Sequence, residues 1–265
     1  MSKDSNRPRS SSADKMVGVP MQTLSGEGHV TLVDYIGSDA SVVRGARCSY
    51  GESNKTFQED ERLIRFLMRH AHTSPFEQVS FVFRLRLPLF LSFEFTRCRP
   101  SKYQIIWPHE DIDFWIPDSI ERSSIEPCYN QIKQLLYSAR NADKDSNIYF
   151  SILPGTVFIE LIWQIDLHNM LYFIQRRREI NLPELKEYID CILLALKSVA
   201  PCCYSAFTDY VLEGKLLKEA DVRSLADQIK SLDGDLIMQE AKKVGMSQGE
   251  TQEFLTKIKR FTSNA

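Results

Sequence analysis

One stretch of strict alternation, residues 79–87, constrains the fold of this 265-residue chain most strongly. The residues at odd positions are all apolar, whereas the even positions hold smaller or charged residues, including Arg84 and Arg86. Side chains with a period of two point alternately to the two faces of a β-strand. The sequence therefore predicts a strand with one buried face and one face that carries two arginines.

Both flanks of this strand carry further local signals. Ser74-Pro75-Phe76-Glu77 has the form of a capping box with proline just inside it, which predicts a sharp turn or a single helical turn. Residues 89–96 are expected to form a short helix that leads into Arg97 and Arg99. Two guanidinium groups so close together suit a phosphate or pyrophosphate. The alternative for these arginines is a solvated, charged helix end.

Hydrophobic periodicity predicts the remaining elements. We expect a first strand at residues 29–35 and a loop at residues 101–117. Helices are expected at residues 40–48, 60–70, 126–141, 156–178 and 183–199, with a helical end at 206–212. The charged, amphipathic tail (residues 218–262) contains a second capping-box pattern at Ser247 and Glu250.

Composition narrows the class of protein. Hydrophobic residues make up 43% of the chain and the formal net charge is −2, so the bulk charge indicates neither nucleic acid nor a membrane surface as a partner. Apolar runs fall short of the roughly 18 residues that span a bilayer, and residues 1–15 lack the apolar region of a secretory signal. Six cysteines without metal-binding spacing are typical of a cytoplasmic protein.

Several polar side chains within these elements could carry chemistry. His70 and His72 are two residues apart, a spacing that does not form a metal pair on a helix. Asp166 and His168 occur inside an apolar segment, where buried polar groups require partners. Arginines 176–178 follow near the expected helix end, where favourable interaction with the helix dipole is the simpler interpretation.

Three segments together resemble the flavin-dependent thymidylate synthases. They are Arg-His-Ala-His-Thr-Ser-Pro-Phe-Glu at residues 69–77, the helix that ends in Arg97-Cys98-Arg99, and Ile-Asp-Leu-His-Asn-Met at residues 165–170. The likeness extends over roughly residues 28–212. It implies an α+β fold, with a central antiparallel sheet and long flanking helices, and a homotetramer. We therefore expect a disordered arm at residues 1–27, the family domain at 28–215 and a helical C-terminal extension at 216–265.

The resemblance also implies a function and a set of site residues. Members of the family methylate deoxyuridylate to thymidylate with FAD, using methylenetetrahydrofolate and NADPH as co-substrates. The pyrimidine nucleotide would be contacted by Glu94, Arg97 and Arg177, and Arg177 would be the catalytic residue that polarises the ring. The residues implied for FAD binding are His72, Thr73, Arg97, Arg99, Asp166 and His168.

This chain departs from the family pattern at several positions. Glu94 stands where the family has glutamine, Cys98 stands where it has histidine, and Phe150 stands near a family arginine. Residues 100–109 lack the family's Asn-Glu, Ser and Arg-Tyr elements. Two alternatives therefore stay open from the sequence: a related flavin enzyme with a different pyrimidine acceptor, or a catalytically degenerate flavin-binding or scaffold paralogue.

Overall fold

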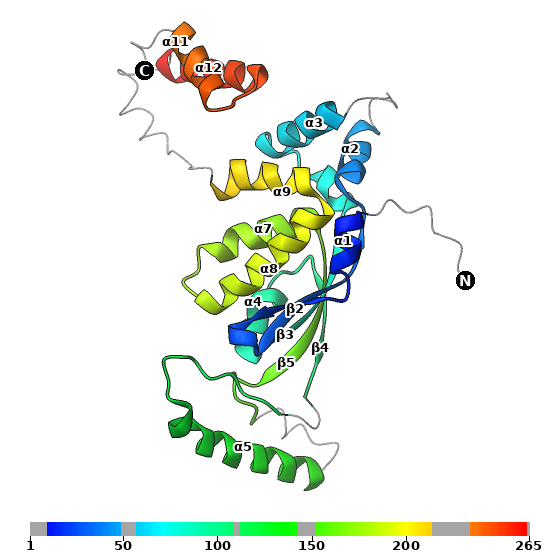
Figure 1. Ribbon diagram of the computed structural model, residues 1–265, viewed down its shortest axis with the longest axis vertical. Coiled ribbons are helices and arrows are strands. Elements are labelled where there is room, and N and C mark those ends of the chain that lie inside the picture. Colours follow the sequence, from blue (N-terminus) through cyan, green and yellow to red (C-terminus); the bar gives the residue numbers. More distant parts are fainter. Residues whose placement is uncertain (1–9, 49–56, 109–111, 143–151, 214–233, 264–265) are drawn as a thin grey trace, which may run out of the picture. The chain divides into compact units, whose positions relative to one another are not determined.

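The computed structural model describes residues 10–48, 57–108, 112–142, 152–213 and 234–263 (Figure 1). Contacts along the chain divide it into two compact units, Met1–Glu213 and Gly214–Ala265. The division falls two residues before the boundary expected from the sequence. In the second unit, α11 (Gly234–Lys243) and α12 (Gln248–Ser263) are joined by the predicted capping box, in which the Ser247 amide donates to Glu250 and the Glu250 amide to Ser247.

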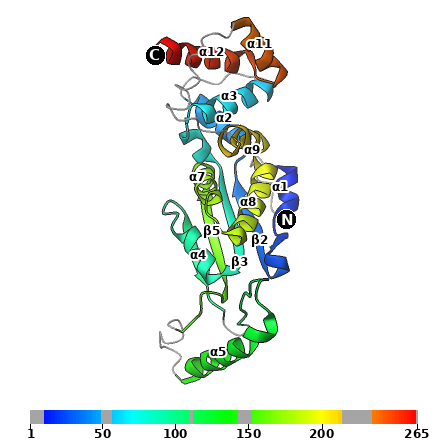
Figure 2. The same cartoon turned by 90° about the vertical axis from the view of Figure 1, so that its left-hand side faces the viewer.

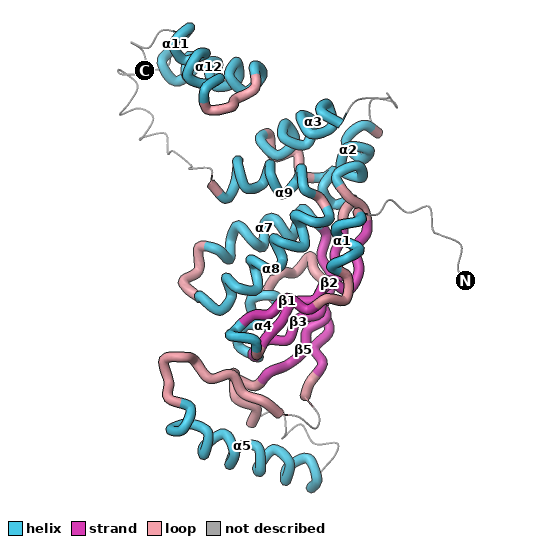
Figure 3. Tube along the Cα trace, viewed as in Figure 1, coloured by secondary structure: helices cyan, strands magenta, loops and turns pink. Residues whose placement is uncertain are grey.

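The first unit contains a five-stranded sheet (Figure 3). Its strands have the order β1-β2-β3-β5-β4, and every neighbouring pair is antiparallel. The strands are β1 (Pro20–Thr23), β2 (Gly28–Ile36), β3 (Ser80–Pro88), β4 (Lys102–Ile106) and β5 (Phe158–Asp166). The alternating segment is β3, which lies at the centre of the sheet between β2 and β5. The predicted α+β class with a central antiparallel sheet is confirmed.

Helices flank the sheet and connect its strands. They are α1 (Ser11–Met16), α2 (Asp39–Arg47), α3 (Phe57–Arg69), α4 (Leu89–Thr96), α5 (Arg122–Ala142), α7 (Leu167–Arg178), α8 (Pro183–Val199) and α9 (Pro201–Phe207). Short helical turns are η1 (Leu24–Gly26), η2 (Ser74–Gln78) and η3 (Thr208–Leu212). The helices expected at 40–48, 60–70, 89–96, 126–141 and 183–199 are confirmed, and the Ser-Pro-Phe-Glu turn is η2.

Helices α4, α7 and α8 pack against the sheet (Figure 2), and aromatic side chains fill the core between them. Trp163 of β5 is fully buried, and its ring centroid lies 5.2 Å from Phe95 of α4 and 5.0 Å from Phe173 of α7. Tyr188 of α8 packs edge-on to Phe95, and its hydroxyl donates to the Arg86 carbonyl at 2.7 Å. This core fixes α4 and α7 against β5, and these are the elements that carry most of the predicted site.

The opposite face of the sheet is polar. Arg84 of β3 forms an ion pair with Glu160 of β5 across the strands, and Nε of Arg84 lies 3.0 Å from that carboxylate. His29 of β2 lies directly opposite Arg86 in the strand register. Burial lowers the pKa of His29, and the charges of Arg86 and Arg84 lower it further, while Glu160 opposes the shift.

The lowered pKa of His29 makes a testable contribution to stability. A histidine with a folded-state pKa below its ordinary value of 6.5 binds more protons when the chain is unfolded. Its contribution is therefore complete above that value and is lost as the pH falls through the unfolded-state pKa. We expect His29→Gln to reduce the loss of unfolding free energy between about pH 7 and pH 5, measured by urea denaturation. An equal loss in both proteins would contradict this assignment.

The single long helix expected at residues 156–178 is wrong. The first part is β5, and only Leu167–Arg178 forms a helix, α7. β5 pairs with β3 on one side and β4 on the other, and its apolar residues face both the core and the partly buried opposite side. Buried Ile159, Leu161, Trp163 and Ile165 alternate with the less buried residues between them, so the segment has the period of two of a strand, which the expectation of one long helix overlooked.

Two further expectations from the sequence need correction. Residues 102–106 form β4 at the sheet edge instead of part of a loop, because they pair with residues 160–164 of β5. The expected disordered arm is wrong for residues 11–27, which include α1, β1 and η1. β1 pairs with β2, and Ala13 of α1 is fully buried in the core. Residues 1–9 lie outside the described part of the chain.

Candidate functional site

Three of the residues predicted to contact the nucleotide, Glu94, Arg97 and Arg177, lie together. Glu94 and Arg97 are on and just after α4, and Arg177 is in the last turn of α7. Oε2 of Glu94 lies 2.9 Å from Nε of Arg177, and its Oε1 lies 3.4 Å from Nη1 of Arg97. Arg177 also donates from Nη2 to the Glu94 carbonyl at 3.4 Å. One carboxylate thus bridges two guanidinium groups.

The geometry of the Glu94–Arg177 pair leaves hydrogen-bonding capacity unused. Their side chains are 17% and 20% exposed, so water screens the pair only in part. Although Glu94 Oε2 and Arg177 Nε are close, the two atoms are not aligned for a hydrogen bond, and both are buried without one among the described residues. Buried polar atoms without hydrogen bonds are costly, so the attraction of opposite charges is what holds this pair together. Arg97 is 70% exposed and can reach a ligand.

The other predicted site residues lie near the paired ends of β3 and β5. Ser80 is opposite Asp166 in the register, and the Leu167 amide donates to the Val79 carbonyl at 2.7 Å. This pairing places η2 beside α7. The exposed His72 and Thr73 immediately precede η2, and the partly buried His168 is in the first turn of α7. His72, Thr73, Asp166 and His168 therefore belong to one end of the sheet.

Asp166 has a structural role that sequence reasoning missed. It is the N-cap of α7, where its Oδ1 accepts the Asn169 amide at 3.0 Å and its Oδ2 accepts Asn169 Nδ2 at 2.7 Å. An aspartate followed three residues later by a polar side chain at the start of an apolar helix could have signalled this cap. Both carboxylate oxygens are engaged, so any contact of Asp166 with a cofactor would compete with the cap.

The cap predicts the effect of replacing Asp166. Asp166→Ala removes the acceptor for the Asn169 amide and is expected to lower the free energy of unfolding by about 1 kcal/mol. Asp166→Asn removes the charge but keeps a good capping side chain, so it should lose much less stability. Urea denaturation of both variants measures the difference. Equal losses would mean that the carboxylate charge, not the cap, carries the contribution.

Comparisons with known proteins decide the family. The family model described as "Thymidylate synthase complementing protein" matches residues 31–202. The chain is 31% identical over 222 residues to the flavin-dependent thymidylate synthase of Thermus thermophilus, covering 75% of this chain and 82% of that protein. The chain belongs to this family.

Other similar proteins agree with this assignment. The flavin-dependent thymidylate synthase of Ehrlichia ruminantium (strain Gardel) is 32% identical over 217 residues, covering 71% of this chain and 73% of that protein. A crystal structure of the UMP/dUMP methylase PolB from Streptomyces cacaoi, bound with 5-Br dUMP, has a TM-score of 0.60 and 20% identity. It covers 72% of this chain and 97% of that chain, and it supports the fold.

A family member requires a place for flavin, and the observed residues fit one in part. The exposed Arg97 and Arg99 offer guanidinium donors suited to a pyrophosphate, and Arg177 adds a partly buried guanidinium group that Glu94 holds in place. Glu94 opposes these cations with one negative charge. Arg97, Arg99 and Arg177 could therefore hold an anionic cofactor or nucleotide, provided that Glu94 yields its contact with Arg97.

Cys98 replaces the histidine that the family places between the two arginines. Burial raises the pKa of its thiol, and hydrogen bonding with Ser101 and the charge of Arg177 only partly offset that shift. The thiol is thus protonated at neutral pH, and a protonated thiol is a poor nucleophile.

Two further observations concern metal binding and membrane-spanning helices. Within the described ranges, histidine, cysteine and acidic side chains do not gather in groups of three that could hold a metal ion. None of the helices in those ranges is long and apolar enough to cross a membrane. Phe150, near the position of a family arginine, lies outside the described residues, as do residues 109–111.

Proposed function

We propose that this protein catalyses the FAD-dependent reductive methylation of a uracil nucleotide, converting dUMP to dTMP. Methylenetetrahydrofolate and NADPH would be its co-substrates. Family membership and the flavin-dependent relatives support the reaction type. The observation that carries the proposal is the cluster of Arg177, Arg97 and Glu94, which joins the ends of α4 and α7 next to residues 97–99.

Each residue of the cluster has a role in this proposal. Arg177 is held in place by the Glu94 carbonyl and carboxylate, and a fixed cation stabilises negative charge as it develops on a pyrimidine ring. Arg97 and Arg99, which are exposed beyond α4, would bind phosphate or pyrophosphate oxygens. Bound flavin supplies the hydride that reduces the transferred methylene group. His72, Thr73 and His168 would line the flavin from the adjacent end of the sheet.

Glu94 would set the charge of the nucleotide site. In the ligand-free protein its carboxylate neutralises part of the positive charge of Arg177 and Arg97. A nucleotide phosphate or flavin pyrophosphate carries more negative charge than one carboxylate, so it would replace Glu94 as the partner of the exposed Arg97. Arg177 would keep its contact with Glu94 because both side chains are largely buried.

The wider organisation belongs to the same proposal. We infer a homotetramer in the cytoplasm, with residues 28–215 as the catalytic domain and residues 216–265 as a helical C-terminal extension. Several side chains implied for the cofactor, among them Arg99, His72 and Thr73, are exposed in one protomer. Exposed cofactor-binding side chains fit a flavin site to which a neighbouring subunit contributes the remaining contacts.

The first test of this proposal is titration of the purified protein with FAD and then with dUMP, followed by flavin absorbance and fluorescence. We expect FAD to bind and dUMP to perturb its spectrum. Replacing both Arg97 and Arg99 by glutamine should weaken FAD binding by about tenfold or more. Arg84→Gln, which removes an exposed arginine from the polar face of the sheet, is the matched control. Unchanged FAD affinity in the double variant would refute this placement of the flavin.

A further inference from the structure

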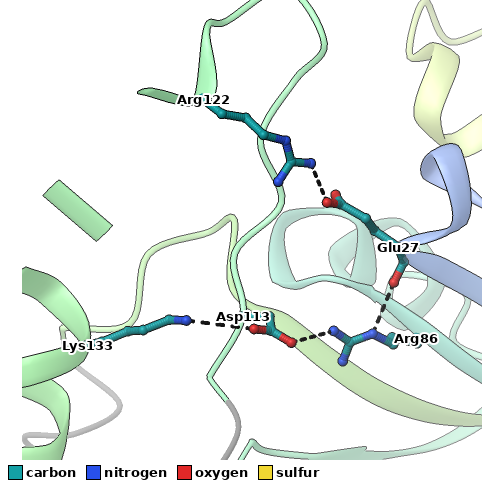
Figure 4. Close-up of polar contacts among 5 residues, drawn as sticks. All are labelled: Glu27, Arg86, Asp113, Arg122 and Lys133. Carbon is teal, nitrogen blue, oxygen red and sulfur yellow. Dashed lines mark hydrogen bonds and ion pairs between the residues drawn. The ribbon is translucent and has the colours of Figure 1, made fainter. Parts of the chain in front are cut away.

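A polar cleft lies between α5, the turn between β1 and β2, and the segment around Asp113 (Figure 4). Its volume is about 610 Å³, and Phe114 and Phe158 contribute aromatic surface to its wall. None of the predicted flavin or nucleotide residues lines it. Its Arg86 lies six residues along β3 from Ser80, which marks the other end of the sheet, so about 20 Å of strand separates them.

The wall that α5 presents to the cleft is polar. Arg122, Glu126, Asn130 and Lys133 recur at spacings of three or four residues and therefore share one face of the helix. Tyr129 belongs to the same face, and its ring stacks on Phe114 at 4.5 Å. A helix that packs on a domain normally turns apolar residues inward. Helix α5 does so through Ile132 and Leu136, and its separate polar face along the cleft suits a polar ligand.

Arg86 is a fixed cation at the floor of this cleft. Its guanidinium group lies over the Phe158 ring at 4.5 Å, its Nε donates to the Glu27 carbonyl at 3.0 Å, and its Nη2 donates to Asp113 at 3.0 Å. Asp113 is also 3.7 Å from Nζ of Lys133, a long and weak contact. The ammonium group of Lys133 is thus available to a ligand.

The ion pair between Arg122 and Glu27 (Figure 4) is shared between this cleft and a second one. Both side chains line both clefts, and the second has a volume of about 330 Å³. Glu27 follows three consecutive residues with left-handed backbone, Leu24 (φ 51°), Ser25 (φ 55°) and Gly26 (φ 94°). The Leu24 amide donates to Glu187 of α8 at 2.6 Å, which holds this turn in place. Backbone strain of this kind concentrates at ligand sites.

We propose that the cleft binds a phosphomonoester, whose phosphate replaces Glu27 as the partner of Arg122 and whose hydroxyl groups reach Lys133, about three helical turns along α5. Arg122 and Glu27 are 53% and 31% exposed, and ion pairs this accessible contribute little. A doubly charged phosphate offers Arg122 a bidentate contact that is stronger than the pair it replaces. Release of Glu27 opens the wall between the two clefts, so the body of the ligand extends from one into the other.

The test is isothermal titration of the full-length protein with ribose 5-phosphate, with ribose as the uncharged control. Glu27 competes with the ligand for Arg122, so Glu27→Gln should tighten binding by about two- to fivefold. Arg122→Gln should weaken it by about tenfold or more. A purely structural ion pair would not produce opposite effects from its two partners. Lys133→Gln, which removes only the long contact to Asp113, should also weaken binding and serves if Arg122→Gln fails to fold.

A separate variant distinguishes this site from the proposed nucleotide site. Arg177→Gln should leave ribose 5-phosphate binding unchanged, because Arg177 does not line the cleft. Three results would overturn the proposal: no binding at millimolar ribose 5-phosphate, effects of Glu27→Gln and Arg122→Gln in the same direction, or loss of binding in Arg177→Gln alone. The last of these would assign the phosphate to the nucleotide site.

Discussion

Replacing Arg177 by glutamine is expected to lower kcat/KM for dUMP methylation by about 10²- to 10³-fold. Removal of one preorganised donor that faces developing charge typically has an effect of this size. Arg177 is 20% exposed and is fixed by both the carboxylate and the carbonyl of Glu94, so solvent cannot readily replace it. Steady-state kinetics with FAD, methylenetetrahydrofolate and NADPH provide the measurement.

Two variants control for charge and for the partner of Arg177. Arg178→Gln removes an exposed neighbouring arginine and should change kcat/KM little. Glu94→Gln supplies the amide that the family has at this position, so dUMP binding should be retained or strengthened. If Arg177→Gln is no more damaging than Arg178→Gln, Arg177 is not the residue that polarises the pyrimidine.

Trp163→Ala is expected to lower the free energy of unfolding by about 3–5 kcal/mol. Trp163 is fully buried on β5, and it contacts Phe83, Phe95 and Phe173 from three different elements. Removal of the indole side chain leaves a cavity, and the three phenylalanine rings cannot move far enough to fill it. Urea denaturation gives the loss, and it also tests the assignment of residues 158–166 to a central strand.

Tyr103→Ala is the matched control for this prediction. Tyr103 is directly opposite Trp163 in the register of β4 and β5, but it is 51% exposed on the edge strand. Its replacement should cost about 1 kcal/mol or less. Equal losses for the two variants would mean that the aromatic cluster around Trp163 does not hold the sheet and helices together.

The local patterns of the sequence predicted much of this fold. The alternation in residues 79–87 produces β3 because one face is buried and the other carries Arg84 and Arg86, and the periodic apolar residues of 183–199 produce α8. β5 was missed because its alternating pattern runs without a break into the apolar residues of α7. β4 was missed because its polar residues pair only at the sheet edge. The positions of β4 and β5 in the sheet depend on their pairing with each other and with β3, which is a tertiary contact.

The candidate site was predictable only where it is local in sequence. Motif resemblance named Glu94, Arg97 and Arg177, but their ion pairs depend on the packing of α4 against α7. The capping role of Asp166 requires knowledge of where α7 begins. The polar cleft joins Glu27, Arg86, Asp113, Arg122 and Lys133, which lie far apart in sequence. The polar cleft was not predicted from the sequence.

The central claim is that this chain methylates C5 of a uracil nucleotide with flavin. Methylation replaces the hydrogen at C5, so the most direct measurement is the release of tritium from dUMP labelled at that carbon. We expect release that requires FAD, NADPH and methylenetetrahydrofolate and is strongly reduced in Arg177→Gln. Protein that binds FAD and dUMP but releases no tritium above a heat-denatured control would contradict the proposed reaction.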